Sequence, residues 1–431
     1  MGLITALGRD VPTCWARLIE GANGIGPITY FDATRYGSGL AAEVTDVPAE
    51  PTGLDALPLE SCRRTVRLFV HGVREAWADA ALPSSMPRAG IGVAVGISAT
   101  YLHNGLLRAH YRYRAEERPV LDVPRFVEAG LEPAFNFHRR LADVAAAVPA
   151  KILGVSGPSF TIDSACAGSA HAIGEAFRAV RDGRAEAMVA GGASALVSPV
   201  GVLAFSLLGA LSTNRDPDRA SRPFDRRRDG FIMGEAGGAV VLERLESARA
   251  RGAKIYGEVC GFGSTTTAQS LTQPSAGGVS EAEAMRLALD DAAAQPGDVQ
   301  YVAAHGTSTP RNDEAETTAI KRVFGAEARS LLVSSNKGQI GHTIAAAGVC
   351  NLVAALKAIG TGVVPPTAHY REPDPACDLD YVPNASRRHT VRTALVNAFA
   401  FGGQNASLVV RGLDEEPAGD ARTGETRRRD D

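Results

Sequence analysis

The chain has 431 residues, of which 45% are hydrophobic and 22% charged, and its formal net charge is −3 at pH 7. This composition is that of a globular protein with a sizeable core, and the slightly negative charge disfavours a general nucleic-acid binder. No apolar run reaches the roughly 18 residues that a membrane span needs, so no membrane partner is expected. The six cysteines form no C-x-x-C pair, which disfavours a zinc or redox motif and favours reduced thiols in the cytoplasm.

The opening residues 1–8 have the pattern of a loop that leads into a helix, with no strand before it. We therefore expect the first strand of the fold to be missing, which implies a native start upstream of Met1. Residues 101–151 are rich in Arg, Tyr and His, and we interpret them as an excursion from the core. Along the rest of the chain strand-like and helix-like runs alternate, which predicts an α/β layered fold.

Cys166 stands in "DSACAGSAHAIGEA", between a strand-like run and a run with apolar residues at helical spacing. This placement predicts a cysteine at a helix N-terminus, where unpaired N–H groups and the helix dipole favour a thiolate. Its small neighbours permit a tight strand-to-helix turn and leave room for an acyl chain. On this stretch alone a buried structural cysteine remains the alternative.

Two histidines lie where buried strands meet polar, glycine-containing loops. His305 ends the strand-like part of "YVAAHGTSTP", and His342 closes "SSNKGQIGH", five residues after Lys337. Strand ends of this kind often carry functional residues in α/β folds, although a locally hydrogen-bonded histidine is the alternative for each. One cysteine with two histidines indicates acyl transfer through a thioester. A Cys–His–Asn protease, which needs one histidine and an orienting amide, is the competing interpretation.

The C-terminal part of the chain carries one more candidate element and a tail. "NAFAFGGQNASLVV" places Phe399 and Phe401 in a glycine-rich turn before a strand, where backbone N–H groups can face an oxyanion. A plain hairpin with core aromatics is the alternative. A second half of the chain is expected from residue 251, and the charged residues 413–431 are expected to be disordered.

Five motifs occur in order: "DSACAGSAHAIGEA", "SRPFDRRRDGFIMGEAGG", "AHGTSTPRNDEAET", "SSNKGQIGHTIAAAG" and "NAFAFGGQNAS". Together they resemble the β-ketoacyl-acyl-carrier-protein synthase family of the thiolase superfamily, and most of all its elongating enzymes. The resemblance implies an α/β thiolase-like fold of two similar halves in a five-layered α-β-α-β-α arrangement. Residues 1–250 would carry Cys166, and residues 251–412 would carry His305 and His342.

The resemblance also implies roles for individual residues. Cys166 matches the acyl-accepting cysteine, and His305 and His342 match the pair that binds the malonyl thioester carbonyl and assists decarboxylation. Lys337 matches the lysine that supports the second histidine loop, and Glu316 matches an acidic residue of the polar network.

Four further residues are matched in the same way. The backbone N–H groups of Cys166 and Phe401 correspond to the oxyanion hole, and Phe401 corresponds to the gating aromatic. Thr307, Thr309 and Phe399 correspond to substrate-binding positions, the two threonines holding the pantetheine arm. No metal or redox cofactor is expected, because decarboxylation supplies the carbanion.

The expected partners are an acyl carrier protein and a second subunit, identical or paralogous. Arg63, Arg64 and Arg67 form one basic cluster and 226–228 another, and either can attract an acidic carrier protein. Solvated surface charge or internal ion pairs are the alternative for both clusters.

Three functional interpretations stay open on the sequence. The first is a ketosynthase of fatty-acid or type II polyketide synthesis. The others are a non-elongating acyltransferase and a non-catalytic partner subunit, which predicts loss of the cysteine. Departures such as Ala167–Gly168 after the cysteine favour specialised metabolism.

Overall fold

The computed structural model describes residues 1–45, 47, 64–98, 122, 124, 142 and 144–413, and the structural statements below concern these residues. Arg63, most of the expected excursion at 101–151 and residues 414–431 of the expected disordered tail lie outside them.

The first sheet contains five strands in the order β1-β8-β6-β4-β5. Strands β4, β5 and β6 run parallel to one another, with β5 at the edge, and β8 runs antiparallel to both β6 and β1. The strand bounds are β1 (Gly2–Thr5), β4 (Ile91–Gly96), β5 (Ser159–Ile162), β6 (Ala187–Ser194) and β8 (Ala236–Glu243).

Strand β1 corrects the expectation that the first strand is missing. Gly2–Thr5 pairs with residues 236–239 of β8 and so provides the fifth strand of the sheet. Four residues are too few to show a clear alternation of apolar and polar side chains, which is why the sequence pattern resembled a loop. The position of Gly2 is decided by packing, because a Cβ atom there would lie 2.0 Å from the Gly72 carbonyl oxygen.

The second sheet also contains five strands, in the order β11-β10-β14-β15-β9. Its strands are β9 (Glu258–Thr266), β10 (Tyr301–Ala303), β11 (Leu332–Ser334), β14 (Thr393–Phe399) and β15 (Gln404–Arg411). The chain passes from the first sheet to the second through α9 (Leu245–Ala250).

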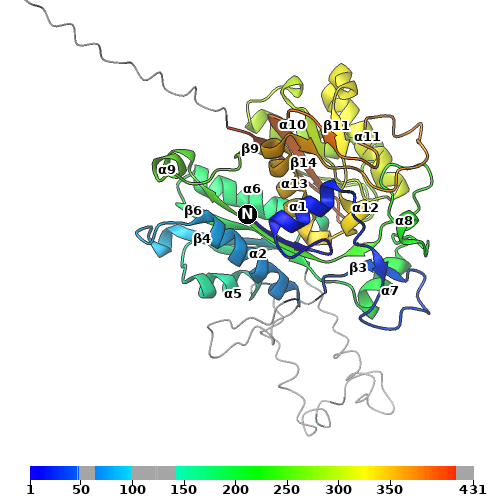
Figure 1. Cartoon of the computed structure of the whole chain (residues 1–431), viewed down its shortest axis with the longest axis horizontal. Coiled ribbons are helices and arrows are strands. Elements are labelled where there is room, and N and C mark those ends of the chain that lie inside the picture. The colour runs from blue at the N-terminus through cyan, green and yellow to red at the C-terminus, as the bar shows by residue number, and fades with distance from the viewer. Residues whose placement is uncertain are drawn as a thin grey trace, which may run out of the picture.

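Helices form three layers around and between the two sheets (Figure 1). Helices α2 (Arg64–Ala80) and α5 (Val144–Leu153) cover the outer face of the first sheet. Helices α6 (Gly168–Arg181) and α13 (Ala347–Thr361) contact strands of both sheets, and α10 (Val279–Asp291) with α11 (Pro310–Phe324) covers the far side. The expected α/β fold in five layers is therefore confirmed.

The remaining elements are short or peripheral. They are α1 (Val11–Ile19), α7 (Pro199–Leu207), α8 (Pro217–Ala220), α12 (Lys337–Ile340), β2 (Gly26–Pro27), β3 (Leu40–Ala42), β7 (Met233–Gly234), β12 (Val363–Val364) and β13 (Arg387–Arg388). The 3₁₀ turns are η2 (Arg88–Gly90), η5 (Ala165–Ala167), η6 (Ala276–Gly278), η7 (Pro296–Asp298), η8 (Gly325–Arg329) and η9 (Ile344–Ala346).

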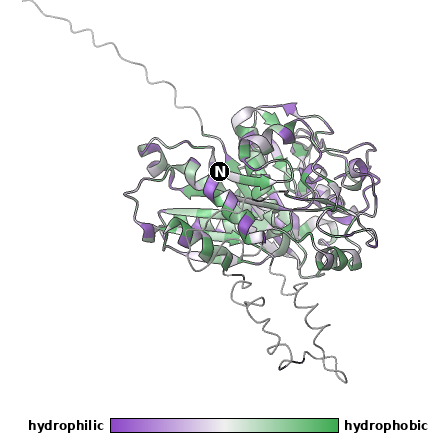
Figure 2. Cartoon of the chain, turned by 60° about the horizontal axis from the view of Figure 1, so that its bottom comes forward, coloured by the Kyte–Doolittle hydropathy of each residue, from purple (hydrophilic) through white to green (hydrophobic). Residues whose placement is uncertain are grey.

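The largest apolar cluster joins the two halves of the chain, because it takes residues from α6, α13 and both sheets. Figure 2 shows the same distribution, with hydrophobic residues concentrated on the strands and inner helices. The stretch Ile344–Thr361, which continues η9 into α13, is long and apolar enough for a membrane span by length and composition, but 78% of it is buried. It lies in the middle layer as a core helix.

Candidate active site

Cys166 lies in the turn η5, which follows β5 and leads directly into α6. Ala165 just before it has φ +45°, a left-handed conformation that is unfavourable for a residue with a side chain. The start of α6 also packs closely on β4, because a Cβ atom on Gly96 would lie 2.0 Å from the Gly168 carbonyl carbon. The predicted tight turn of small residues is thus present, and it carries local strain.

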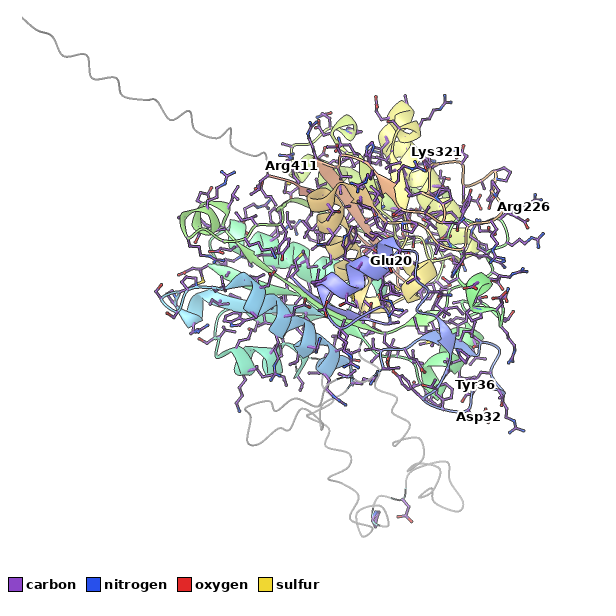
Figure 3. All side chains as sticks on the ribbon, viewed as in Figure 1. Glu20, Asp32, Tyr36, Arg226, Lys321 and Arg411 are labelled. Atoms are coloured by element: carbon purple, nitrogen blue, oxygen red, sulfur yellow. The ribbon has the colours of Figure 1, made fainter. Side chains whose placement is uncertain are left out.

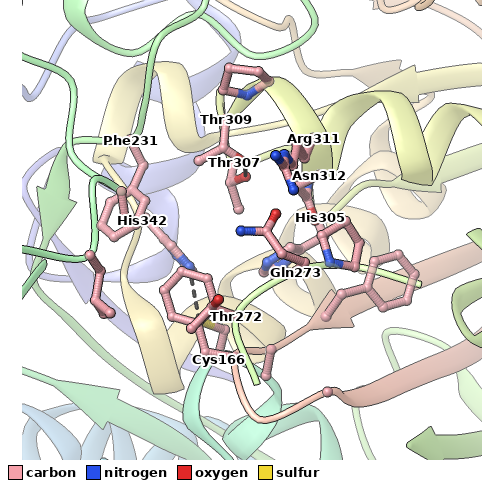
Figure 4. A pocket seen from close by; sticks show the side chains of 18 of the residues that line it. Cys166, Phe231, Thr272, Gln273, His305, Thr307, Thr309, Arg311, Asn312 and His342 are labelled. Atoms are coloured by element: carbon pink, nitrogen blue, oxygen red, sulfur yellow. Dashed lines mark hydrogen bonds between the residues drawn. The ribbon is translucent and has the colours of Figure 1, made fainter. Parts of the chain in front are cut away.

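His342 is the direct partner of the thiol. Its Nε2 atom lies 3.1 Å from the Cys166 sulfur (Figure 4). The Ile344 backbone N–H donates to the Nδ1 atom of the same ring at 3.3 Å. Because Nδ1 accepts this hydrogen bond, the proton of the neutral imidazole belongs on Nε2, which faces the sulfur.

His305 stands beside this pair without a hydrogen bond to the thiol. Its ring centre lies 5.3 Å from that of His342, with the ring planes 82° apart, and 5.8 Å from the Phe399 ring. Its Nδ1 atom is buried and has no hydrogen-bond partner among the described residues. A second imidazole is therefore available to a substrate next to the first.

The ligand atoms of Cys166, His305 and His342 lie within 4.8 Å of one another. One sulfur and two imidazoles suit Zn²⁺, and in the described part of the chain this is the one group of three or more such side chains that close together. A metal ion bound there would occupy the nucleophile.

Lys337 and Glu316 hold the main chain of His305 rather than its ring. The Lys337 ammonium donates to the carbonyl oxygen of His305, while the resemblance had linked this lysine to the loop of His342. Glu316 accepts the backbone N–H groups of His305 at 2.8 Å and Gly306 at 2.7 Å, and the Asn397 side-chain amide at 3.0 Å. Asn397 was not expected from the sequence, since nothing local distinguishes it from other strand residues.

Burial decides the charge states of these groups. It lowers the pKa values of His305 and His342 well below the ordinary value, and the nearby Lys337 charge adds to this effect. Both imidazoles are therefore neutral at pH 7. Burial also raises the pKa of Glu316 to about 6 and lowers the pKa of Lys337 to about 8, so that at pH 7 both are mostly charged.

The thiol itself differs from the sequence expectation. Burial raises the pKa of Cys166 to about 11, although the Lys337 charge and the backbone N–H groups of Phe401 and Cys166 act in the opposite direction. The resting group is a thiol rather than the expected thiolate, because loss of solvation outweighs the neighbouring donors and the helix N-terminus.

The backbone N–H groups of Phe401 and Cys166 were expected to form an oxyanion hole, and both act to lower the pKa of the Cys166 thiol. Phe401 follows β14 in the turn to β15, where Gly402 and Gly403 have φ of +87° and +78°. A Cβ atom on Gly403 would lie 2.3 Å from the Thr267 carbonyl oxygen, so a glycine is required to keep this turn in place.

A cavity of about 310 Å³ opens onto the three central residues. Seven of the predicted residues line it: Cys166, His305, Thr307, Thr309, His342, Phe399 and Phe401. Lys337 and Glu316 do not line it. Several lining residues were not expected from the sequence, chiefly Phe231, Thr272, Gln273, Arg311 and Asn312 (Figure 4). The polar residues of "TQPSAGG" and "PRNDE" were the available signal.

The two basic clusters are only partly internal: Arg228 is buried, whereas Arg226 and Arg227 are exposed. Arg228 is 8% exposed, and Arg64 forms an ion pair at 2.9 Å with the fully buried Glu235. Arg67 donates to the Val47 carbonyl oxygen at 3.1 Å. The alternative of internal pairing thus holds for Arg64 and Arg228, while the exposed Arg226 projects from the molecular edge (Figure 3).

Comparison with known proteins gives a consistent answer. Residues 1–248 match the beta-ketoacyl synthase N-terminal domain, and residues 256–371 match the C-terminal domain. The 3-oxoacyl-[acyl-carrier-protein] synthase 2 of Synechocystis sp. is 40% identical over 95% of this chain and 96% of its own length. The Staphylococcus aureus enzyme of the same name is 38% identical over the same shares.

Solved structures support the same family assignment. A type II polyketide ketosynthase, bound to the hexaketide and in complex with its acyl-carrier protein, superposes with a TM-score of 0.83 at 31% identity, covering 96% of this chain and 98% of that one. The ishigamide ketosynthase/chain length factor gives 0.84 at 33% identity with the same coverage. The chain therefore belongs to the beta-ketoacyl synthase family and is a β-ketoacyl-acyl-carrier-protein synthase of fatty-acid or type II polyketide synthesis.

Proposed function

We propose that Cys166 accepts the acyl chain and that His305 and His342 together stabilise the malonyl enolate in a decarboxylative condensation. The observation that carries this proposal is the fixed orientation of His342, whose Nε2–H faces the reaction centre while its Nδ1 is held by Ile344.

The first step is acyl transfer. The Cys166 sulfur attacks the carrier thioester, a new S–C bond forms, and the pantetheine thiolate leaves with the proton that the cysteine loses. The N–H groups of Cys166 and Phe401 stabilise the oxyanion of this step, because both already act to lower the pKa of the Cys166 thiol.

The second step forms the carbon–carbon bond. The malonyl C–CO₂ bond breaks, and its electron pair becomes an enolate whose oxygen accepts hydrogen bonds from the neutral imidazoles of His305 and His342. The enolate carbon attacks the acyl-cysteine carbonyl, and the Cys166 thiolate leaves and is reprotonated. We propose that no metal or redox cofactor takes part, since loss of carbon dioxide supplies the electron pair.

The arrangement argues against a Cys–His–Asn protease. Such an enzyme needs a histidine that accepts the thiol proton and an amide that orients its ring. The His342 ring presents an N–H to the sulfur, and among the described residues no side-chain amide is hydrogen-bonded to either histidine ring. The side-chain amide of Asn397 donates to Glu316 and not to a histidine ring.

We also propose an acyl carrier protein and a second ketosynthase-like subunit, identical or paralogous, as partners in the cytoplasm. β5 pairs only with β4 in the described part of the chain and leaves an open sheet edge that a second subunit can cover. Specialised metabolism is favoured because the sequence departs from the usual family pattern next to Cys166, and a type II polyketide ketosynthase is among the similar structures.

Intact-protein mass spectrometry tests this function. The protein is mixed with a panel of acyl-carrier-protein thioesters, and malonyl-carrier protein is then added. The expected result is an acyl adduct that is absent in Cys166→Ala, followed by a carrier-bound product two carbons longer. An adduct without elongation would favour the non-elongating acyltransferase, and no adduct from any donor would favour a partner subunit.

A further inference from the structure

Arg228 lies in "RPFDRRRDG", where the sequence left a partner surface and internal ion pairs both open, and its side chain is only 4% exposed. Its guanidinium donates through Nε to the Thr309 carbonyl oxygen at 3.2 Å and through Nη2 to the Pro310 carbonyl oxygen at 2.8 Å. The Nη1 atom donates to the Asp225 carbonyl oxygen at 3.0 Å and to the Asp374 carboxylate. One buried arginine, which does not line the cavity, thus binds the turn between β10 and α11.

Asp313, in the first turn of α11, binds the N–H groups of the same turn. Its carboxylate accepts Thr307 at 3.0 Å and Ser308 at 3.2 Å, and it lies 3.7 Å from Arg228 Nε. The carbonyl groups of the turn therefore point to a cation and its N–H groups to an anion, and the two charges face each other.

The turn needs this support because its backbone is strained. Ser308 has φ +68°, which is uncommon for a residue with a side chain, and such a conformation persists only where surrounding contacts enforce it. The segment that carries Arg228 adds two contacts: the Arg222 N–H donates to Ser308 Oγ at 2.9 Å, and the Gly230 N–H donates to the Ser308 carbonyl oxygen at 3.1 Å.

The other side of the turn faces the cavity. Thr307 and Thr309 both line it, and their hydroxyl oxygens lie 2.8 Å apart. Together they offer two adjacent hydroxyl groups to an amide-bearing arm, and a shift of the turn would move both at once.

We propose that Arg228 is a positioning residue: it fixes the Thr307–Thr309 turn and thereby sets the affinity of the enzyme for substrates carried on a pantetheine arm. This inference rests on the proposed function, in which the two threonines hold that arm. Arg228 itself touches no substrate, and it does not line the cavity.

Arg228→Lys is the informative variant. Lysine keeps a positive charge between Asp313 and Asp374 but lacks the planar fork that reaches two successive carbonyl oxygens. Arg228→Gln would leave two carboxylates without their cation, so failure to fold would be expected and uninformative.

The matched control is Arg251→Lys. Arg251 likewise combines a carboxylate, Glu243 at 2.8 Å, with two successive carbonyl oxygens, those of Ala80 at 2.9 Å and Ala81 at 3.1 Å. It lies outside the cavity lining, so its replacement repeats the chemical change without touching the turn.

The experiment compares loading of Cys166 by one acyl group on two carriers: the acyl carrier protein, and ethanethiol, which has no pantetheine amide. In Arg228→Lys we expect kcat/KM for the carrier-protein thioester to fall about tenfold, mainly through KM, as loss of one to two hydrogen bonds implies. The kcat/KM for loading from the ethyl thioester should stay within about twofold of the wild-type value. Arg251→Lys should leave kcat/KM unchanged for both thioesters.

Equal slowing with both thioesters would overturn the inference, because it would indicate a general disturbance of the site. No change with either would overturn it as well. Wild-type protein that loads from neither thioester would defeat the proposed function and the inference with it. An active wild type with an unaffected Arg228→Lys would defeat the inference alone.

Discussion

The Nε2 atom of His342 lies 3.1 Å from the Cys166 sulfur, while the Ile344 N–H group occupies the Nδ1 atom of the same ring. This relationship gives the two histidines different parts in the reaction. In the proposed reaction His342 contacts both the thiol and the incoming malonyl unit, whereas His305 has no hydrogen bond to the thiol among the described residues.

His305→Ala is therefore expected to load an acyl chain but not to elongate it. The thiol and its His342 contact remain, so the rate of loading should stay within about threefold, whereas loss of one enolate donor should lower condensation by roughly 10²-fold or more. Mass spectrometry of the Cys166 adduct and of the carrier product measures the two steps separately. Condensation at the wild-type rate would refute the role of His305.

The ionisation of Cys166 can be followed by alkylation with iodoacetamide, which reacts with the thiolate. Because burial raises the pKa of this thiol to about 11, the rate should rise about tenfold per pH unit from pH 7 to pH 9 without a plateau. Cys166→Ala corrects for the other cysteines. A plateau near neutral pH would show that Lys337 and the helix N-terminus outweigh burial.

The buried Lys337 makes stability depend on pH in the alkaline range. Its folded-state pKa of about 8 lies below the ordinary 10.5, so between these values the unfolded chain binds more protons than the folded one. Stability from this group therefore rises with pH across that window, by roughly 1–3 kcal/mol. Urea unfolding at pH 8 and pH 10 measures the rise.

Lys337→Met should remove this rise, and replacement of the exposed Lys151 by Met should leave it unchanged. An equal rise in both variants would assign the effect to other groups. Glu316 has the opposite effect on the pH dependence of stability. Because its pKa is raised to about 6, its contribution to stability falls as pH increases from about 4.5 to 6.

The strained turn at the nucleophile predicts a specific effect of side-chain branching. Ala165 and Ala81 both have φ +45°, but only Ala165 adjoins Cys166. A β-branched residue is unfavourable there, so Ala165→Val and Ala81→Val should each cost about 1–3 kcal/mol of unfolding free energy.

Only Ala165→Val is expected to slow acyl loading as well, because it displaces the sulfur from its donors. Ala165→Gly, which accepts this conformation without strain, should load normally. The measurements are urea unfolding and the rate of Cys166 acylation. Equal loading rates for the two valine variants would show that strain at Ala165 does not affect acyl transfer.

Local patterns in the sequence predicted those parts of the site that depend on neighbouring residues. The helical spacing after Cys166 and the small residues around it indicated the tight turn, and the buried strands before His305 indicated a strand end. Strand β1 was missed, because four residues carry too little periodicity and its pairing with β8 joins residues more than 230 positions apart.

Local sequence patterns did not predict which charged or ionisable side chains are buried. For Arg228 and Arg64 a partner surface and internal pairing both stayed open, because the sequence does not show which carboxylates and carbonyl groups lie around them. The thiolate expected at a helix N-terminus was wrong for the same reason, since burial of Cys166 depends on both halves of the chain.

By itself, the sequence predicted the alternating α/β architecture, because short-range periodicity is encoded locally. Through the family resemblance of its motifs it also predicted Cys166 as the nucleophile and His305 and His342 as its partners. The tertiary structure decided which ring nitrogen of His342 carries the proton. It also decided that Lys337 and Glu316 hold the backbone of His305. In the same way, it placed Arg228 against the Thr307–Thr309 turn. These relations follow from contacts between segments far apart in the chain, and from loss of solvent around them, which only the packed fold creates.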